Sequence, residues 1–202
     1  MKEVVYVVMV DGKKTRVLPE ERKVNEGPNA IERVGKLVED HATTVVAEHA
    51  AHAAVSAAMP WASAMLVANP ALGMVAQLAL ASRSIDPQSP IAVLGVEQAG
   101  VRKDTLDRCE RSFGSSGSDV AYPSAGGQAG YPVYLSPEAR EKLDGMPDGD
   151  LLTAVRANNE LTKTAVEVRD VGIYLDLGAD DSHREALRQI TQDSLERETP
   201  GA

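Results

Sequence analysis

The chain has 202 residues, of which 43% are hydrophobic and 25% are charged, so it is long enough and apolar enough to fold around its own core. Its formal net charge of -9 argues against binding to nucleic acid, which depends on clustered Lys and Arg. A single cysteine, Cys109, excludes an intramolecular disulfide and a cysteine-rich zinc site.

The N-terminal segment carries the pattern of β-structure. Residues 4–10 are apolar throughout and rich in valine, and Asp11-Gly12 separates them from a second short arm at residues 15–18. Asp-Gly between two such arms is a strong hairpin signal. We therefore expect a β-hairpin whose first strand is buried on both faces. No signal peptide is recognisable, which is compatible with the cytoplasm or a virion and leaves the location open.

A long helix is predicted next, over residues 29–58. Ile31, Val34 and Val38 recur at helical spacing, and the pattern continues into an alanine-rich run that ends at Pro60. A second helix is predicted over residues 63–82, with a kink near Pro70. The two helices would form a helical hairpin.

Residues 53–82 contain no charged side chain. A helix that is apolar on all sides must be enclosed by protein or lipid. We therefore expect the helical hairpin to present an association surface to another molecule. The candidate contact residues are Trp61, Met65, Leu66, Met74, Val75 and Leu78.

Three polar residues would share one edge of the first predicted helix: His41, Glu48 and His52. Two His and a Glu can bind a transition metal, but neither His-Glu-x-x-His nor Glu-x-x-His occurs here. We therefore predict no metal site and interpret the stripe as solvated or hydrogen-bonded between subunits. A metal site and a pH-sensitive interface remain the alternatives.

Residues 91–96 are typical of a buried strand and residues 101–113 of a helix. The turn between them, from Gly95 to Gly100, has the glycine spacing of a phosphate-binding loop. Val101 and Arg102 stand where that loop needs Lys and Ser or Thr, which argues against nucleotide hydrolysis. Anion binding at the start of the helix remains an alternative.

The remaining chain alternates between loops and short elements. Residues 114–130 are rich in Gly and Ser and predict a flexible loop. A strand at 132–135 then leads to Ser136, a suitable helix N-cap before Pro137. A helix at 150–158, strands within 166–177 and a final helix at 181–196 complete the expectation.

The predicted fold class is α+β. It comprises a small mixed β-sheet with an N-terminal β-hairpin, packed with a long Ala-rich helical hairpin and several short helices. The organisation would be residues 1–113, a loop at 114–130, and a C-terminal α/β portion at 131–202 in the same domain.

The function that these patterns favour is a non-catalytic, self-associating structural or assembly protein of a larger particle, such as a virion, a secretion system or another multimer. It would form homo-oligomers and need no cofactor, metal or catalytic residue. One alternative is a membrane-active protein that inserts residues 53–82 into lipid. A second is a small-ligand or anion-binding α/β protein that uses the Gly95 to Gly100 turn.

Overall fold

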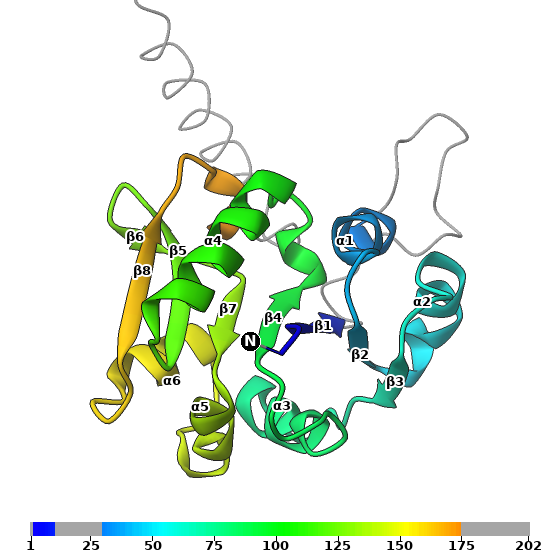
Figure 1. The fold of residues 1–202 in the computed structure, drawn as a ribbon. Coiled ribbons are helices and arrows are strands. Elements are labelled where there is room, and N and C mark those ends of the chain that lie inside the picture. The colour runs from blue at the N-terminus through cyan, green and yellow to red at the C-terminus, as the bar shows by residue number, and fades with distance from the viewer. Residues whose placement is uncertain (1, 11–29, 175–202) are drawn as a thin grey trace, which may run out of the picture.

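The computed structural model of the protein describes residues 2–10 and 30–174. These residues form an eight-stranded mixed sheet with helices on both faces (Figure 1). The strand order is β3-β2-β1-β4-β7-β5-β6, and β8 pairs with β5. The mixed α and β character that the sequence predicts is therefore confirmed.

The first half of the sheet is parallel. Its strands are β1 (Val5–Val10), β2 (Thr43–Ala47), β3 (Ala64–Val67) and β4 (Ile91–Gly95). The connecting helices are α1 (Ala30–Val38), α2 (His52–Ala58) and α3 (Met74–Ser82). In β2 and β4 every residue is buried, as expected of parallel strands that are covered on both faces.

The second half of the sheet combines antiparallel and parallel pairs. Its strands are β5 (Val120–Ala125), β6 (Gln128–Ala129), β7 (Val133–Leu135) and β8 (Lys163–Glu167). Strand β7 is antiparallel to both β4 and β5, and β8 is parallel to β5. The helices of this half are α4 (Lys103–Ser116), α5 (Pro137–Glu141) and α6 (Leu151–Ala157). Four short 3-10 turns are η2 (His49–Ala51), η3 (Val96–Gln98), η4 (Leu143–Gly145) and η5 (Val171–Tyr174).

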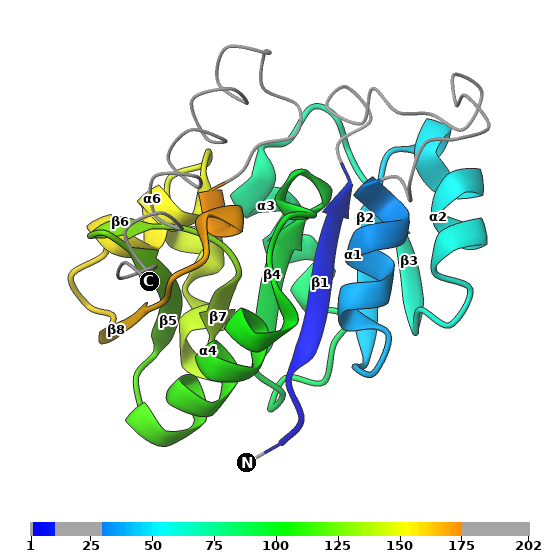
Figure 2. The same ribbon diagram turned by 90° about the horizontal axis from the view of Figure 1, so that it is seen from above.

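Two views show how the helices cover the sheet. Helices α1 and α4 lie over one face, and α3, α5 and α6 lie over the other (Figures 1 and 2). The chain steps outward from β1 through β2 to β3 and then returns through α3 to β4, on the opposite side of β1. The strand order therefore reverses between β1 and β4, and such a reversal opens a crevice at the carboxyl ends of the strands.

Several local predictions are confirmed. The strand expected at 91–96 is β4, and the helix expected at 101–113 is α4. Ser136 caps α5, since its Oγ accepts a hydrogen bond of 3.1 Å from the backbone N–H of Ala139. Asp150 caps α6 in the same way, accepting from the N–H of Thr153 at 2.8 Å. These caps could be predicted because each depends only on neighbouring residues.

The predicted N-terminal hairpin is wrong. Strand β1 is buried as expected, but its two neighbours are β2 and β4, both parallel to it. Neither edge of β1 is left for an antiparallel arm. The proposed turn and second arm, residues 11–18, lie outside the described residues.

The predicted helical hairpin is also wrong. The first helix ends at Val38, and residues 43–47 form strand β2, between β1 and β3. The second predicted helix contains β3 and, after a loop, α3. Thr43, Thr44, Val45 and Val46 form a β-branched run that suits a strand, whereas their apolar spacing alone suggested a continuing helix.

The predicted flexible loop at 114–130 contains the end of α4 and the strands β5 and β6. One sheet therefore runs through both of the portions that the sequence separated. Of the strands predicted within 166–177, the first overlaps β8 and residues 171–174 form η5, while residues 175–177 and the final helix lie outside the described residues.

Candidate functional site

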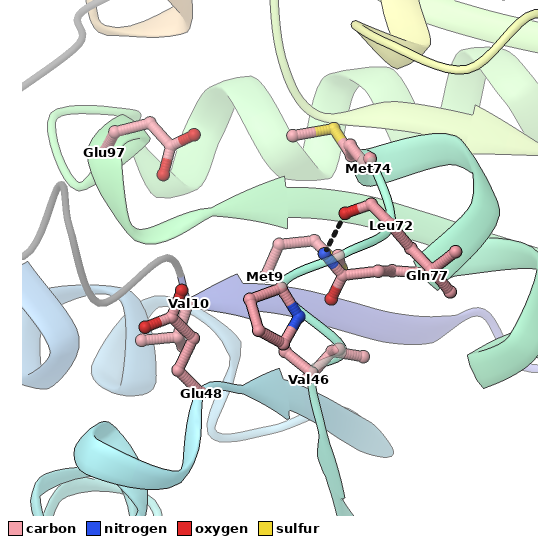
Figure 3. A pocket seen from close by; sticks show the side chains of 11 residues that line it. Met9, Val10, Val46, Glu48, Leu72, Met74, Gln77 and Glu97 are labelled. Carbon is pink, nitrogen blue, oxygen red and sulfur yellow. Dashed lines mark hydrogen bonds between the residues drawn. The ribbon is translucent and has the colours of Figure 1, made fainter.

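A pocket of about 220 Å³ lies at the carboxyl ends of the parallel strands β1, β2 and β4 (Figure 3). The loop after β3 and the start of α3 form its other wall. Its lining residues are Met9, Val10, Val46, Glu48, Ala68, Pro70, Leu72, Gly73, Met74, Gln77 and Glu97. This is the crevice that the reversal of strand order creates, and it is where open α/β sheets bind ligands.

Glu97 lies in η3, just beyond the end of β4, and only 8% of it is exposed. A Cβ atom on Gly95 would lie 2.5 Å from the carboxyl carbon of Glu97, so glycine at this position lets the carboxylate fold back over the strand end. The Oε1 atom of Gln98 accepts a hydrogen bond of 2.9 Å from the N–H of Gly95 and closes the turn. The turn therefore fixes a buried carboxylate at the pocket.

Glu48 follows β2 directly and is partly buried. Its backbone is extended and leads into η2, which turns the chain away from the sheet. Figure 3 shows Glu48 and Glu97 on two sides of the pocket, with Val10 at the end of β1 between them in this view. Two carboxylates from different strand ends therefore face one crevice.

The opposite wall is the loop from Ala68 to Gly73, which connects β3 to α3. Asn69 stabilises its turn, because its Oδ1 accepts a hydrogen bond of 3.0 Å from the N–H of Ala71. The N–H of Gly73, at the start of α3, donates to Asp148 Oδ2 at 2.8 Å. Hydrogen bonds thus fix the wall both within the loop and to Asp148, which is distant in the sequence.

Gln77 projects from α3 into the pocket (Figure 3). Its Nε2 donates a hydrogen bond of 3.0 Å to the carbonyl oxygen of Leu72, which fixes the orientation of the amide. Within the described part of the chain, its buried Oε1 has no hydrogen-bond partner. The side chain therefore braces the loop and leaves an acceptor on this side of the pocket.

Tyr131 contacts the side chain of Met74. The hydroxyl of Tyr131 lies 3.6 Å from the Met74 sulfur and donates a hydrogen bond of 2.8 Å to Asp150 Oδ1. Burial, together with the negative charge of Asp150, raises the pKa of Tyr131 well above its usual range. Tyr131 therefore stays protonated and keeps donating at neutral pH.

The pocket side chains that carry polar atoms are Glu48, Gln77 and Glu97, and none of the described lining residues is Lys, Arg or His. All three present acceptors to the pocket, since the amide N–H of Gln77 is taken by Leu72. Such a lining repels a bare anion. It suits a ligand that brings hydrogen-bond donors or a cation.

The arrangement also limits how a metal ion could be held. Among residues 2–10 and 30–174, no group of three or more His, Cys, Asp or Glu is placed to hold a metal ion. Glu48 and Glu97 alone fit the mode typical of Mg²⁺, in which one or two carboxylates are completed by water and by the phosphates of the substrate. A cation would therefore bind here together with a phosphorylated ligand.

The predicted polar stripe is not formed. Glu48 lines the pocket, but His41 lies before β2, where its ring packs 4.6 Å from that of Tyr6. His52 lies in α2, with its Nε2 3.1 Å from the carbonyl oxygen of Ala47. The three residues share no face, because a strand replaces the helix on which they were placed.

The residues predicted as an association surface are divided between the core and the pocket. Val75 and Leu78 are buried, with 1% and 0% exposure. Trp61, Met65, Leu66 and Met74 are partly buried against the same core, and Met74 also lines the pocket. Self-association through these residues stays a prediction.

These features define a class, namely an α/β protein with an acidic ligand pocket at the carboxyl ends of its parallel strands. The profile of the MobA-like NTP transferase domain matches residues 23–165, more than two thirds of the chain. The chain belongs to this family. No curated protein matches the sequence.

Several solved structures have a fold similar to that of this chain. Rv0371c from Mycobacterium tuberculosis H37Rv, in complex with manganese, has 17% identity and a TM-score of 0.69, covering 93% of this chain and 99% of that one. Molybdopterin-guanine dinucleotide biosynthesis protein A from Archaeoglobus fulgidus has 15% identity and a TM-score of 0.62, covering 94% and 100%. 4-Diphosphocytidyl-2C-methyl-D-erythritol synthase has 14% identity and a TM-score of 0.67, covering 94% of this chain and 99% of that one. At these identities the likeness establishes the fold.

The predicted function as a structural or assembly protein is wrong, because the chain belongs to a family of nucleotidyltransferases. None of the described helices is long and apolar enough to cross a membrane. The apolar segment 53–82 is instead divided among α2, β3 and α3.

The sequence indicated the Gly95 to Gly100 turn as a possible ligand site without singling out the side chain of Glu97 within it, and it did not identify Gln77 or Gly73 as pocket residues. One signal was available for Glu97, since an acidic residue directly after a buried strand, in a glycine-containing turn, marks the carboxyl edge of a parallel sheet. No comparable signal existed for Gly73 and Gln77, because the continuous helix predicted over 63–82 left out the loop between β3 and α3 that brings both residues to the pocket.

Proposed function

We propose that this protein is a nucleotidyltransferase that binds a nucleoside triphosphate with a divalent cation in the pocket at Glu48 and Glu97. It would transfer the nucleoside monophosphate to an acceptor and release pyrophosphate. The observation that carries the proposal is the charge of the pocket: in a chain of the NTP transferase family, its described side chains supply two carboxylates and no basic group.

The charge of the pocket explains why a cation is needed. A nucleoside triphosphate is a polyanion, and the two carboxylates that line the same pocket would repel it strongly in a partly enclosed site. A divalent cation bound with the triphosphate supplies the positive charge that neutralises both partners. The related Rv0371c was solved in complex with manganese, which supports the inclusion of Mn²⁺ beside Mg²⁺ among the metals to test.

The transfer is a substitution at the α-phosphorus. An oxygen of the acceptor forms a bond to the α-phosphorus, and the bond from the α-phosphorus to the oxygen that bridges to the β-phosphorus breaks. Pyrophosphate leaves with that electron pair, and any proton on the acceptor oxygen passes to solvent. This reaction requires little covalent chemistry from the protein, so positioning and charge are its main contributions.

The two walls of the pocket would bind different parts of the ligand. Glu97 and Glu48, at the ends of β4 and β2, would hold the cation and orient the phosphates. Pro70, Leu72 and Met74 form an apolar wall that suits the uncharged nucleoside part of the ligand. The order of the strands thus brings both functions to one edge of the sheet.

The proposal is tested by measuring the unfolding temperature of metal-free protein with ATP, GTP, CTP and UTP, each with Mg²⁺, Mn²⁺ or EDTA. We expect at least one nucleotide to raise the unfolding temperature with metal and to lose this effect in EDTA. In calorimetry, Glu97→Gln should weaken that binding by at least about tenfold, because it removes a charge that holds the cation.

Glu141→Gln is the matched control, since Glu141 is exposed on α5 and the change alters the net charge equally. It should bind nucleotide as the wild type does. Absence of binding by all four nucleotides with either metal would contradict the proposal. So would equal affinity of Glu97→Gln and the wild type.

A further inference from the structure

The loop between η4 and α6 reaches across to the pocket wall through Asp148. The N–H of Gly73 donates to Asp148 Oδ2 at 2.8 Å, and the N–H of Ala76 donates to Asp148 Oδ1 at 3.3 Å. Asp148 therefore receives hydrogen bonds from two backbone donors in the first turn of α3, more than 70 residues away in the sequence.

The contact between Asp148 and Gly73 is tight. A Cβ atom on Gly73 would overlap the carboxylate of Asp148, so this approach requires glycine. The carboxylate is also held by the N–H of Gly149, which donates to Oδ1 at 3.0 Å. The side chain thus has a fixed orientation although it lies at the surface.

Asp148 also determines what the start of α3 can bind. The free N–H groups at a helix start attract anions, and here a carboxylate of the protein already accepts from Gly73 and Ala76. A ligand phosphate would have to displace it. Beside this point the wall is apolar, formed by Pro70, Leu72 and Met74. This end of the pocket therefore suits the uncharged part of a ligand.

The same short loop supports the next wall residue. Asp150 accepts a hydrogen bond of 2.8 Å from the hydroxyl of Tyr131, and that hydroxyl lies 3.6 Å from the sulfur of Met74. Gly73 and Met74, which are adjacent in the pocket lining, are thus held by Asp148 and, through Tyr131, by Asp150. One loop of the mixed half of the sheet thus fixes this wall of the parallel half.

We infer that Asp148 is a positioning residue that holds the pocket wall at residues 70–74 in place against the nucleobase and ribose of the bound nucleotide. The inference rests on the proposed function. Asp148 would contact no ligand itself and would act through Gly73. Its removal should therefore weaken binding of the nucleoside part and leave binding of the phosphates unchanged.

Asp144 provides a matched control. It lies in η4, four residues before Asp148, and its carboxylate pairs with Arg83 at the other end of α3, with both oxygens 3.0 Å from the guanidinium. Both acids are exposed and both tie α3 to the same region of the chain. Only Asp148 contacts a pocket residue.

The test compares the wild type with Asp148→Ala, Asp148→Asn and Asp144→Ala by calorimetry. The probes are the nucleoside triphosphate that binds most tightly and inorganic triphosphate, each with Mg²⁺. We expect Asp148→Ala to raise the Kd of the nucleotide about tenfold, since two hydrogen bonds to the wall are lost, and to leave the Kd of inorganic triphosphate unchanged. Asp148→Asn should show a smaller rise, because its amide oxygen can still accept from Gly73.

The outcomes separate this inference from the proposed function. If the wild type binds nucleotide and the Asp148 variants bind it equally well, the positioning role is refuted and the proposed function stands. An equal loss of nucleotide and triphosphate, or an effect of Asp144→Ala as large as that of Asp148→Ala, also refutes the positioning role. A wild type that binds no nucleotide overturns both. Should Asp148→Ala fail to fold, the two Kd values of Asp148→Asn decide the question.

Discussion

At the scale of single residues, carboxylates that receive hydrogen bonds hold distant segments together. Asp119 precedes β5 and Thr162 precedes β8. The carboxylate of Asp119 accepts hydrogen bonds of 2.7 Å from the Thr162 hydroxyl and 2.8 Å from its backbone N–H. The hydroxyl, and then the N–H, of Thr162 lower the pKa of Asp119. This pair aligns the starts of two parallel neighbours, β5 and β8.

The lowered pKa of Asp119 predicts a pH-dependent stability. A carboxyl group whose pKa is lower in the folded state stabilises the fold above its unfolded pKa, near 3.9, and loses this contribution as the pH falls through the folded value. Asp119→Ala should therefore lower the free energy of unfolding by about 1 kcal/mol at pH 7. Urea titrations at pH 7 and below pH 3 measure the difference between variant and wild type. It should shrink in acid, and a difference that stays constant would contradict this account.

At the scale of elements, Arg140 joins the two halves of the protein. It lies in α5, only 7% of it is exposed, and its guanidinium donates to the carbonyl oxygens of Ser82, Asp86 and Ser89. The carbonyl of Ile85 lies 3.4 Å from the same group. These four residues form the end of α3 and the loop into β4. The arginine thus supplies donors to carbonyl groups at and beyond the end of a helix, of which those of Ser82 and Asp86 also accept from backbone N–H groups.

Replacement of Arg140 should therefore be costly. Arg140→Met keeps the apolar stem but removes all the guanidinium hydrogen bonds and takes from the carbonyl groups of Ile85 and Ser89 the donor that they share, which should lower the free energy of unfolding by about 3 kcal/mol. Arg140→Lys should lose less, since an ammonium group retains some of the contacts. Arg156→Met is the control, because Arg156 is exposed in the last turn of α6. Equal midpoints of urea unfolding for Arg140→Met and Arg156→Met would disprove the role of this contact.

The elements that the sequence predicted well are those whose signals are local. Strand β4 is an uninterrupted apolar run, and Ser136 and Asp150 mark helix starts by their own hydrogen bonds. Strands β2 and β3 lie within a stretch where Ala and Val occupy all faces, so the apolar spacing fitted a helix equally well. Short apolar runs do not distinguish a buried helix from a buried strand. Pairing of β2 with β1 and of β3 with β2 decided the outcome.

The pocket was harder to predict than the elements, because no continuous segment contains it. Its residues come from the ends of β1, β2 and β4 and from the start of α3. Glu48 was singled out, but as part of a helical stripe with His41 and His52 that the structure separates. Only the order of the parallel strands brings Glu48 and Glu97 to one crevice. A hydrophobic pattern contains no information on that order.

At the scale of the whole molecule, the apolar segment 53–82 is partly buried in the chain's own core. Val55, Met59, Val75 and Leu78 belong to the common core. In the described part of the chain, the large hydrophobic residues that remain exposed are Val67 and Leu80. Part of the cover that we expected from neighbouring molecules is therefore supplied within the protein. Homo-oligomer formation remains a proposal that light scattering can test.

The net negative charge of the molecule is interpreted differently once the pocket is known. A net charge of -9 argued against binding to nucleic acid, yet a phosphorylated small ligand is compatible with it when a divalent cation accompanies the ligand. The described pocket lining shows the same sign of charge locally, with Glu48 and Glu97 and no basic side chain. Nucleotide affinity should therefore depend strongly on the metal.

The most direct test locates the nucleotide through the methyl signals of methionine. Met9 and Met74 line the pocket, whereas Met59 and Met146 are buried elsewhere in the core. In protein labelled with ¹³C at the methionine methyl groups, titration with a nucleoside triphosphate and Mg²⁺ should shift the NMR signals of Met9 and Met74 and leave those of Met59 and Met146 in place. Binding that shifts Met59 or Met146 instead, or a titration that leaves all four signals unmoved, would contradict the assignment of this pocket as the nucleotide site.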